Sequence, residues 1–254
     1  MGANSIGGTN AGVATTKKTF EILETLAEEE GTTITGLART TGMAKSTVFR
    51  HVETLRDLGY VVEREGELHL GFRLLELSEQ ARNRKLGYLA TKEKVVELAQ
   101  ETGERAIFLV EEAGEGVYIH SFGGVSDTMI GKRRPLYSLA SGKAILAGWS
   151  EERVDRYLHG LEPRPFATNT ITDTDALREE IRITGERGYA INDEERMDGL
   201  RGVAVTVFDE NHAVLGGLGV FGPVSRFTER EMHERLPPVL RHKAEEIKIA
   251  LAYG

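Results

Sequence analysis

Apolar residues near the start of the chain recur at helical spacing. From about Thr16 onward, Phe20, Leu23 and Ala27 lie on one stripe, and the pattern stops before Gly31. The spacing predicts an amphipathic helix of about three turns. Residues 1–15 are mostly small and polar, so they bury little apolar surface and are expected to form a flexible tail.

Two further helices and a hairpin follow. The pattern predicts a short helix capped by Thr35 and ended by Gly42, then a longer helix over residues 44–58. The apolar stripe of the longer helix consists of Val48, Val52, Leu55 and Leu58. Residues 60–62 and 68–70 are extended in character on either side of Gly66, which predicts a β-hairpin. Three helices and a hairpin give the outline of a winged helix, with a domain expected over residues 16–75.

The rest of the chain mixes strands and helices. A helical, then polar, stretch predicts a linker helix over residues 76–87, and a helix over 88–101 opens a second domain that extends to residue 254. Strand-like runs lie at 106–111, 116–122, 203–209 and 213–221, and helical runs at 142–147, 151–158, 175–187 and 229–252. Hairpins enclosed by helices predict an α+β sheet domain.

Composition narrows the function classes. The chain has 254 residues, of which 40% are hydrophobic and 28% charged, typical of a soluble globular protein of one or two domains. It has no cysteine, which excludes a disulfide, a thiolate nucleophile and a cysteine-based zinc finger. We expect a cytoplasmic protein without a signal peptide or membrane span. The excess of arginine over lysine is compatible with a salt-rich cytoplasm.

The net charge of −8 argues against nucleic-acid binding, but the charge is unevenly distributed. Residues 39–56 contain four basic side chains and one acidic side chain. In the same segment Ala38, Gly42 and Val48 have the spacing of a helix-turn-helix, in which a small residue, a left-handed turn and an apolar plug hold two helices together. This combination predicts that the helix over 44–58 enters the major groove of DNA.

The predicted DNA contacts are polar or basic side chains on this surface. They are Lys45, Ser46, Thr47, Arg50 and His51 on the third helix, Thr35 and Arg39 on the second, and Arg64 on the hairpin. The alternative is that these residues form only the solvated face of a three-helix bundle.

Ordered motifs extend along nearly the whole chain. In the first domain these are TFEIL (19–23), GMAKSTVFR (42–50) and LHLG (68–71). In the second they are RPL (134–136), ASGKA (140–144), GYA (188–190), the acidic pair 194–195, GLRGVAVTV (199–207) and GP (222–223). In this order the motifs resemble those of the IclR-type transcriptional regulators. The resemblance implies a winged helix-turn-helix domain joined by a linker helix to a GAF-like α+β effector-binding domain. It also implies a homodimer or homotetramer, a roughly palindromic double-stranded DNA operator and regulation by a small metabolite.

The same resemblance places an effector site in the second domain. Carried over by position, its residues are Ala140, Ser141, Gly142, Asn192, Asp193, Glu194, Gly202, Gly219 and Phe221. Amides at a helix start near Ser141 are suited to an anion or a carbonyl oxygen, although Ser141 could equally be an ordinary cap. Gly202 and Gly219 replace larger residues of relatives, which suggests a roomier pocket with Phe221 as an aromatic wall. The expected effector is a sugar acid, an organic acid or an aromatic acid.

No motif points to catalysis or to a cofactor. Gly217, Gly219 and Gly222 have dinucleotide-fingerprint spacing, but Pro223 stands where a helix should open. The seven histidines show no metalloprotease pattern, and no serine lies in a nucleophile elbow. We therefore expect no enzyme activity, no cofactor, no metal and no membrane partner. The alternative is a small-molecule-processing enzyme or sensor module whose winged helix mediates protein contacts.

Overall fold

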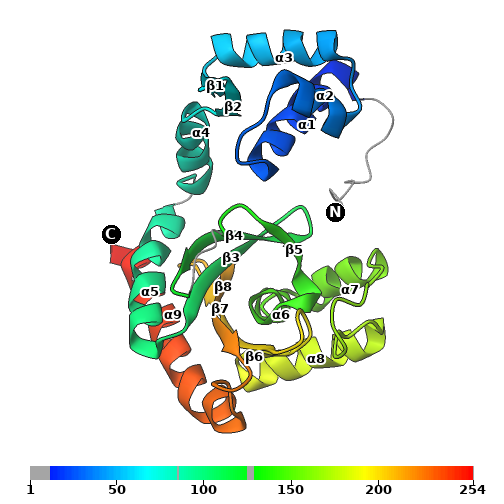
Figure 1. The fold of residues 1–254 in the computed structure, drawn as a ribbon. Coiled ribbons are helices and arrows are strands. Elements are labelled where there is room, and N and C mark those ends of the chain that lie inside the picture. Colours follow the sequence, from blue (N-terminus) through cyan, green and yellow to red (C-terminus); the bar gives the residue numbers. More distant parts are fainter. Residues whose placement is uncertain (1–11, 85, 125–128, 254) are drawn as a thin grey trace. The chain divides into compact units, whose positions relative to one another are not determined.

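The chain folds into two compact units, residues 1–81 and 82–254. The computed structural model describes residues 12–84, 86–124 and 129–253, and each unit is described by itself (Figure 1). Most of the tail expected over residues 1–15 lies outside the described residues. Its last two residues, Ala14 and Thr15, belong to the first helix, so helical structure begins slightly before the expected Thr16.

The first unit is a three-helix domain with a hairpin. Its elements are α1 (Ala14–Glu28), α2 (Ile34–Thr41), α3 (Lys45–Asp57), β1 (Val61–Arg64) and β2 (Glu67–Leu70). One buried cluster joins all of them: Ile22, Leu26, Leu37, Val48, Val52, Leu55, Val61 and Leu68. The hairpin turns at Glu65 and Gly66, both with positive φ, as a two-residue turn with the right-handed strand twist requires. The predicted winged helix is confirmed.

Two details of this unit differ from the sequence-based prediction. The cap of α2 is Thr33, not Thr35: the Thr33 Oγ1 accepts a hydrogen bond from the Gly36 amide at 3.1 Å. The two threonines, separated by Ile34, are equally good caps by type, and the backbone conformation selects between them. Leu58, predicted on the buried stripe, is 47% exposed, because α3 ends one residue before it.

A fourth helix with an exposed apolar surface follows the hairpin. Helix α4 spans Arg73–Arg82, earlier than the linker helix expected over 76–87, and none of its residues is buried. Phe72, Leu75 and Leu77 are 77%, 60% and 52% exposed. Scattered apolar residues are common on protein surfaces, but three large ones within six positions form an apolar surface.

The second unit is built on one antiparallel sheet. The strands are β3 (Arg105–Glu112), β4 (Glu115–Phe122), β5 (Arg133–Pro135), β6 (Ala190–Asp193), β7 (Leu200–Phe208) and β8 (Val214–Pro223). Their order is β5-β4-β3-β8-β7-β6. The helical elements are α5 (Leu86–Thr102), η1 (Leu136–Ser138), α6 (Ala140–Ala147), α7 (Glu151–His159), α8 (Thr174–Arg187), the π-helical turn η2 (Glu231–Arg235) and α9 (Leu236–Tyr253). The α+β class is confirmed, while the short edge strands β5 and β6 were not predicted.

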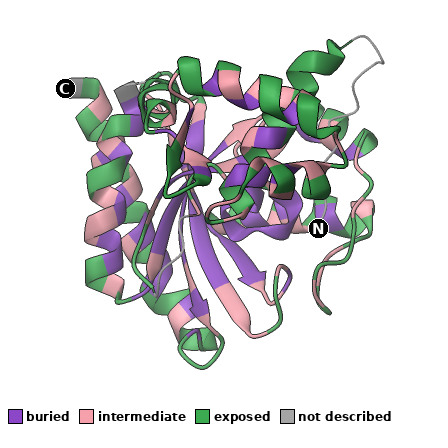
Figure 2. Ribbon diagram, turned by 45° about the horizontal axis from the view of Figure 1, so that its top comes forward, coloured by how far each residue is buried: buried purple, intermediate pink, exposed green. Residues whose placement is uncertain are grey.

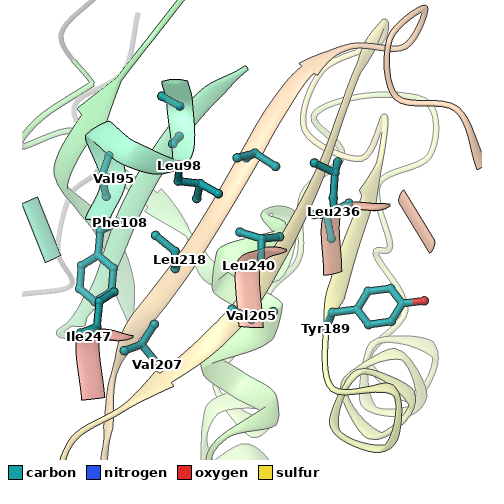
Figure 3. Packing of buried hydrophobic residues seen from close by; sticks show 14 of the residues in the cluster. Val95, Leu98, Phe108, Tyr189, Val205, Val207, Leu218, Leu236, Leu240 and Ile247 are labelled. Atoms are coloured by element: carbon teal, nitrogen blue, oxygen red, sulfur yellow. The ribbon is translucent and has the colours of Figure 1, made fainter. Parts of the chain in front are cut away.

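Helices cover both faces of this sheet. Helices α5 and α9 pack on one face, where Val95, Leu98, Phe108, Leu218 and Leu240 share a core (Figure 3). The sheet curves around α6 on its other face (Figure 1), and a second core lies there. The strands of the sheet are largely buried and the outer helix faces exposed (Figure 2). Within the described residues, no helix is both long and apolar enough to cross a bilayer.

Candidate functional site

The first candidate site is the exposed face of α3. Gly42 ends α2 with φ of +68°, a left-handed conformation that suits glycine, and α3 begins directly after Ala44. Val48 is fully buried between the helices, whereas Lys45, Ser46, Phe49 and Arg50 are exposed. The helix-turn-helix that the spacing of Ala38, Gly42 and Val48 predicts is therefore present in the structure.

The predicted DNA contacts differ in how far their side chains are exposed. Six of them are exposed: Thr35, Arg39, Lys45, Ser46, Arg50 and Arg64. Thr47 and His51 are partly buried. The Nδ1 atom of His51 lies 2.8 Å from the Thr19 Oγ1, a hydrogen bond that joins α3 to α1. His51 thus has a structural partner within the domain.

The basic residues of this face differ in whether an acid neutralises them. Arg56 lies 3.0 Å from Glu53 and 3.2 Å from Glu63 on the hairpin. Among the described residues, Lys45 and Arg50 form no such pair. Positive charge is therefore concentrated toward the N-terminal half of α3, the half that reaches base edges in helix-turn-helix proteins.

Phe49 is the feature of this face that sequence reasoning missed. Its side chain is 52% exposed and lies on the stripe of α3 that includes Ser46 and Glu53. The sequence analysis gave this residue no role of its own, since it lies outside the apolar stripe of Val48, Val52, Leu55 and Leu58 and is not polar. Its exposure could have been inferred from its place next to Val48, since adjacent residues of a helix point in different directions.

The second candidate site is a cavity of about 300 Å³ in the second unit. It lies between the start of α6 and the sheet, and the 196–202 segment contributes to its wall. Six of the nine predicted effector residues line it: Ala140, Ser141, Asn192, Gly202, Gly219 and Phe221. These six residues come from four elements, α6, β6, β7 and β8, which are far apart along the chain.

Three predicted effector residues do not line the cavity, each for a local reason. Gly142 faces η1, and a Cβ there would lie 2.1 Å from the Leu136 carbonyl oxygen. The Asp193 carboxylate pairs with Arg201 at 2.6 Å. The Glu194 carboxylate accepts a hydrogen bond from the Gly199 amide at 2.7 Å and closes a local loop.

The start of α6 also differs from expectation. Its N-cap is Leu139, which has no side-chain cap hydrogen bond, so Ser141 is not the cap. The first amides of a helix have no intrahelical partner, and here Ala140 and Ser141 line the cavity. This helix start is therefore suited to accept an anion or a carbonyl oxygen.

Gly202 and Gly219 line the cavity and allow close packing of neighbouring strands. Gly202 is the cross-strand partner of Phe221, and Gly219 is that of Ala204. A Cβ on Gly202 would lie 3.1 Å from the Phe221 Cβ, and one on Gly219 would lie 2.9 Å from the Ala204 Cβ. Phe221 is thus a large aromatic residue of the cavity wall and lies opposite a glycine.

Sequence reasoning missed the charge of the cavity. Five basic residues line it: Arg105, Lys132, Arg134, Arg196 and Arg201. No acidic residue of the described chain lines it. The basic residues come from separate strands and loops, so no sequence motif joins them. A protein of net charge −8 therefore has a cationic cavity.

Burial changes the acid–base properties of two groups at this cavity. Burial raises the pKa of Tyr118 to about 12, so its phenol is a neutral hydrogen-bond donor at neutral pH. Burial, and secondarily the neighbouring Arg134, lower the pKa of Arg196. Tyr118, Arg134 and Arg196 therefore form one electrostatically coupled group.

A buried ion pair holds the loop that carries Arg196. The Lys143 Nζ donates to the Glu195 Oε1 at 2.6 Å, and the two side chains are 1% and 8% exposed. The Glu195 Oε2 is buried without a hydrogen-bond partner. Burial raises the pKa of the Glu195 carboxyl, although the Lys143 ammonium opposes this effect. This pair fixes the loop to α6, next to the cavity.

Both units match the domains of one family of known proteins. Residues 88–249 match the family "Bacterial transcriptional regulator IclR C-terminal" and residues 15–65 match the "IclR helix-turn-helix domain". This chain belongs to the IclR family of transcriptional regulators. It is accordingly a DNA-binding transcriptional regulator with a C-terminal domain that binds a small-molecule effector.

Known relatives cover nearly the whole chain. The HTH-type transcriptional regulator KdgR of Escherichia coli K12 is 34% identical over 248 residues, which are 95% of this chain and 94% of KdgR. The crystal structure of the Thermotoga maritima IclR is 32% identical, with a TM-score of 0.82 over 94% of this chain and 99% of that chain. An IclR homologue of Microbacterium hydrocarbonoxydans, crystallised with 4-hydroxybenzoate, shares the fold at 22% identity, with a TM-score of 0.78 over 95% of this chain and 100% of that chain.

Two further site types were weighed from the sequence, a metal site and a dinucleotide site. No group of three or more His, Asp or Glu residues there is arranged to hold a metal ion. Gly217, Gly219 and Gly222 lie within β8, which is followed by a turn rather than by the helix of a dinucleotide site.

Proposed function

We propose that α3 of this regulator reads DNA in the major groove through Lys45, Ser46 and Arg50. All three are exposed in the first half of the helix, and Lys45 and Arg50 have no acidic partner among the described residues. Arginine and lysine donate to guanine or to phosphate oxygens, and serine to either. Arg39 and Thr35 on α2, and Arg64 on the hairpin, are proposed to contact the DNA backbone.

Phe49 is proposed as a base-reading residue of the same face. An exposed aromatic ring on a groove-facing helix favours the C5-methyl group of thymine, the apolar group that the major groove presents. It lies one position from Arg50, so a donor contact and an apolar contact are available to neighbouring base pairs. This placement favours an operator with a thymine next to the base pair that Arg50 contacts.

A homodimer on a roughly palindromic operator is the second part of the proposal. Phe72, Leu75 and Leu77 expose an apolar surface at and beside α4 that a second copy of the chain would cover. Two copies of α3 would then contact half-sites about one helical turn apart. We propose that the protein acts in the cytoplasm, where DNA is accessible, as a regulator rather than as an enzyme.

The effector is proposed to be a small organic anion bound in the cavity of the second unit. Five basic side chains and the start of α6 line this cavity, and all favour negative charge. Sugar acids, organic acids and aromatic acids satisfy this requirement. The 4-hydroxybenzoate of the Microbacterium homologue is one such aromatic acid.

A gel-shift titration with the DNA upstream of the protein's own coding region tests the DNA-binding part. Arg50→Ala should weaken binding by about 1 to 3 kcal/mol, or about 5- to 150-fold. The control is Arg178→Ala, an exposed arginine of α8 in the other unit. Unchanged operator affinity in Arg50→Ala would remove Arg50 from the interface, and the absence of any sequence preference would favour the protein-contact alternative.

Ligand-induced stabilisation tests the effector part. A ligand that binds only the folded protein raises its apparent stability by RT ln(1 + [L]/Kd). Gluconate and 4-hydroxybenzoate should raise the melting temperature of the full-length protein, and Ser141→Trp, which fills the cavity, should abolish the shift. Shifts that persist in Ser141→Trp would place the ligand elsewhere.

A further inference from the structure

Two arginines that line the cavity affect each other electrostatically and have no acidic partner among the described residues. Arg134 comes from β5 and Arg196 from the loop between β6 and β7. Within the described residues neither forms an ion pair. The Arg134 Nη1 donates instead to the Arg133 carbonyl at 2.7 Å, and the Arg196 guanidinium stacks 4.0 Å from the centre of the Phe166 ring.

We propose that the effector is an organic dianion and that Arg134 and Arg196 bind its second anionic group. This inference rests on the cavity being the effector site, as proposed above, and specifies the charge of the ligand. The first anionic group would lie at the start of α6, by Ala140 and Ser141. The second group, a carboxylate or a phosphate, would lie between the two guanidinium groups.

Electrostatics favours a ligand group at this position. Two like charges that face one partly buried space repel each other, and each loses hydration. The lowered pKa of Arg196, caused by burial and by Arg134, is a consequence of this arrangement. A bound anion would offset the repulsion between the two guanidinium groups. Binding is favoured because the unliganded protein already bears the free-energy cost of holding these two charges in a partly buried space.

The remaining basic residues of the cavity do not compete for this role. Arg201 is neutralised by Asp193 at 2.6 Å and also donates to the Phe227 carbonyl at 3.1 Å. The Arg105 Nε donates to the Gly123 carbonyl at 3.0 Å. Lys132, the third of these residues, also interacts with another group of the chain. We therefore assign Arg134 and Arg196 to the ligand.

The site is also preorganised for an anion. Arg196 is held from one side by Phe166 and through its neighbour Glu195, which Lys143 fixes to α6. Tyr118, also on the cavity wall, keeps a neutral phenol that can donate a hydrogen bond. Planar guanidinium groups bind carboxylate and phosphate by paired hydrogen bonds, so little further ordering is needed.

A matched pair of six-carbon sugar acids tests the proposal. Gluconate has one carboxylate, and glucarate has a carboxylate at each end of the same chain. 6-Phosphogluconate carries a phosphate at the second end. Melting temperatures of the full-length protein are measured against concentration of each compound, which gives apparent dissociation constants.

The second anionic group should tighten binding substantially. We expect glucarate or 6-phosphogluconate to bind about ten- to hundredfold more tightly than gluconate. Arg134→Gln and Arg196→Gln should each remove this preference, because each weakens binding of glucarate and 6-phosphogluconate much more than binding of gluconate. Arg196→Lys, which keeps the charge, should retain part of the preference, whereas loss of a purely structural contact with Phe166 would not be rescued by the charge.

Arg133→Gln is the matched control. Arg133 neighbours Arg134 on β5 but pairs with Glu112 and does not line the cavity. This variant should keep the full preference for the dianions. A loss of preference in Arg133→Gln would mean that the effect is a general one of charge, and would overturn the assignment to Arg134 and Arg196.

The possible failures are distinguishable. Equal binding of gluconate and the dianions would overturn the dianion proposal while the effector site stands. A preference that persists in both glutamine variants would overturn the assignment of the two arginines. No stabilisation by any of the three compounds, nor by 4-hydroxybenzoate, would contradict the anion site itself and the dianion proposal with it.

Discussion

Replacement of Lys143 by methionine should destabilise the effector domain strongly. Methionine keeps the apolar stem but removes the ammonium that lies 2.6 Å from the Glu195 Oε1. The carboxylate is then left 8% exposed with no cation, and its Oε2 already lacks a hydrogen-bond partner. Breaking such a buried pair costs about 3 to 5 kcal/mol, against about 0 to 1 kcal/mol for an exposed pair.

The unfolding of this domain can be followed separately. The chain has a single tryptophan, Trp149, which lies in the second unit between α6 and α7. Urea titration monitored by its fluorescence reports this domain without the charge screening that guanidinium introduces. A loss of 3 to 5 kcal/mol would lower the melting temperature by about 6 to 20 °C for a domain of this size.

The stability loss caused by Lys143→Met should increase with pH. Burial raises the pKa of Glu195 in the folded protein above the model-compound value of 4.5, and loss of Lys143 raises it further. Below about pH 4.5 the carboxyl is protonated in both states, so the penalty of the variant should largely disappear. The penalty should grow as the pH rises and become complete above the folded-state pKa.

Two outcomes would refute this reasoning. A loss below about 1 kcal/mol at pH 8 would mean that the pair behaves as a solvated one. A loss that is the same at low and high pH would mean that lost packing, not an uncompensated carboxylate, is responsible. The double variant Lys143→Met/Glu195→Gln should recover much of the lost stability, because it also removes the carboxylate charge. If it does not, lost packing is responsible for the destabilisation.

Three further predictions follow from glycine geometry and from the apolar surface at α4. Gly142→Ala should destabilise the effector domain by about 1 to 3 kcal/mol or more, because its Cβ would meet the Leu136 carbonyl oxygen. The control is Gly160→Ala, whose Cβ would meet nothing within 4 Å and which should be neutral or slightly stabilising in the same fluorescence assay. Gly42→Ala should cost about 1 to 2 kcal/mol through its φ of +68°, measured by circular dichroism, and an unaffected melting curve would show that the turn relaxes. Leu75→Glu should shift the protein toward monomer in sedimentation velocity, and an unchanged dimer would place the interface elsewhere.

The DNA-binding unit follows closely from local sequence. The period of its apolar residues locates α1, α3 and the hairpin, and Gly42 ends α2 because its turn needs a left-handed residue. These signals are local, so they predict the elements without knowledge of the rest of the fold. The errors, Thr33 in place of Thr35 as cap and the exposed Leu58, lie at helix ends, where neighbouring residues are equally suitable by type.

The effector unit depends more on tertiary context. The central strands β3, β4, β7 and β8 were predicted because they are long and apolar. The edge strands β5 and β6 have three and four residues, too few for a period to show, and only pairing with neighbours defines them.

The sequence by itself determined the two-domain winged-helix and α+β organisation, the helix-turn-helix, and the elements around the cavity, because repeating apolar spacing and ordered motifs encode them locally. Only the tertiary structure decided the chemistry of the cavity. Arg134, Tyr118 and Arg196 come from separate segments and carry no shared motif. Their common charge and burial exist only because the sheet folds around α6, and they point to an anionic effector in a protein whose net charge is negative.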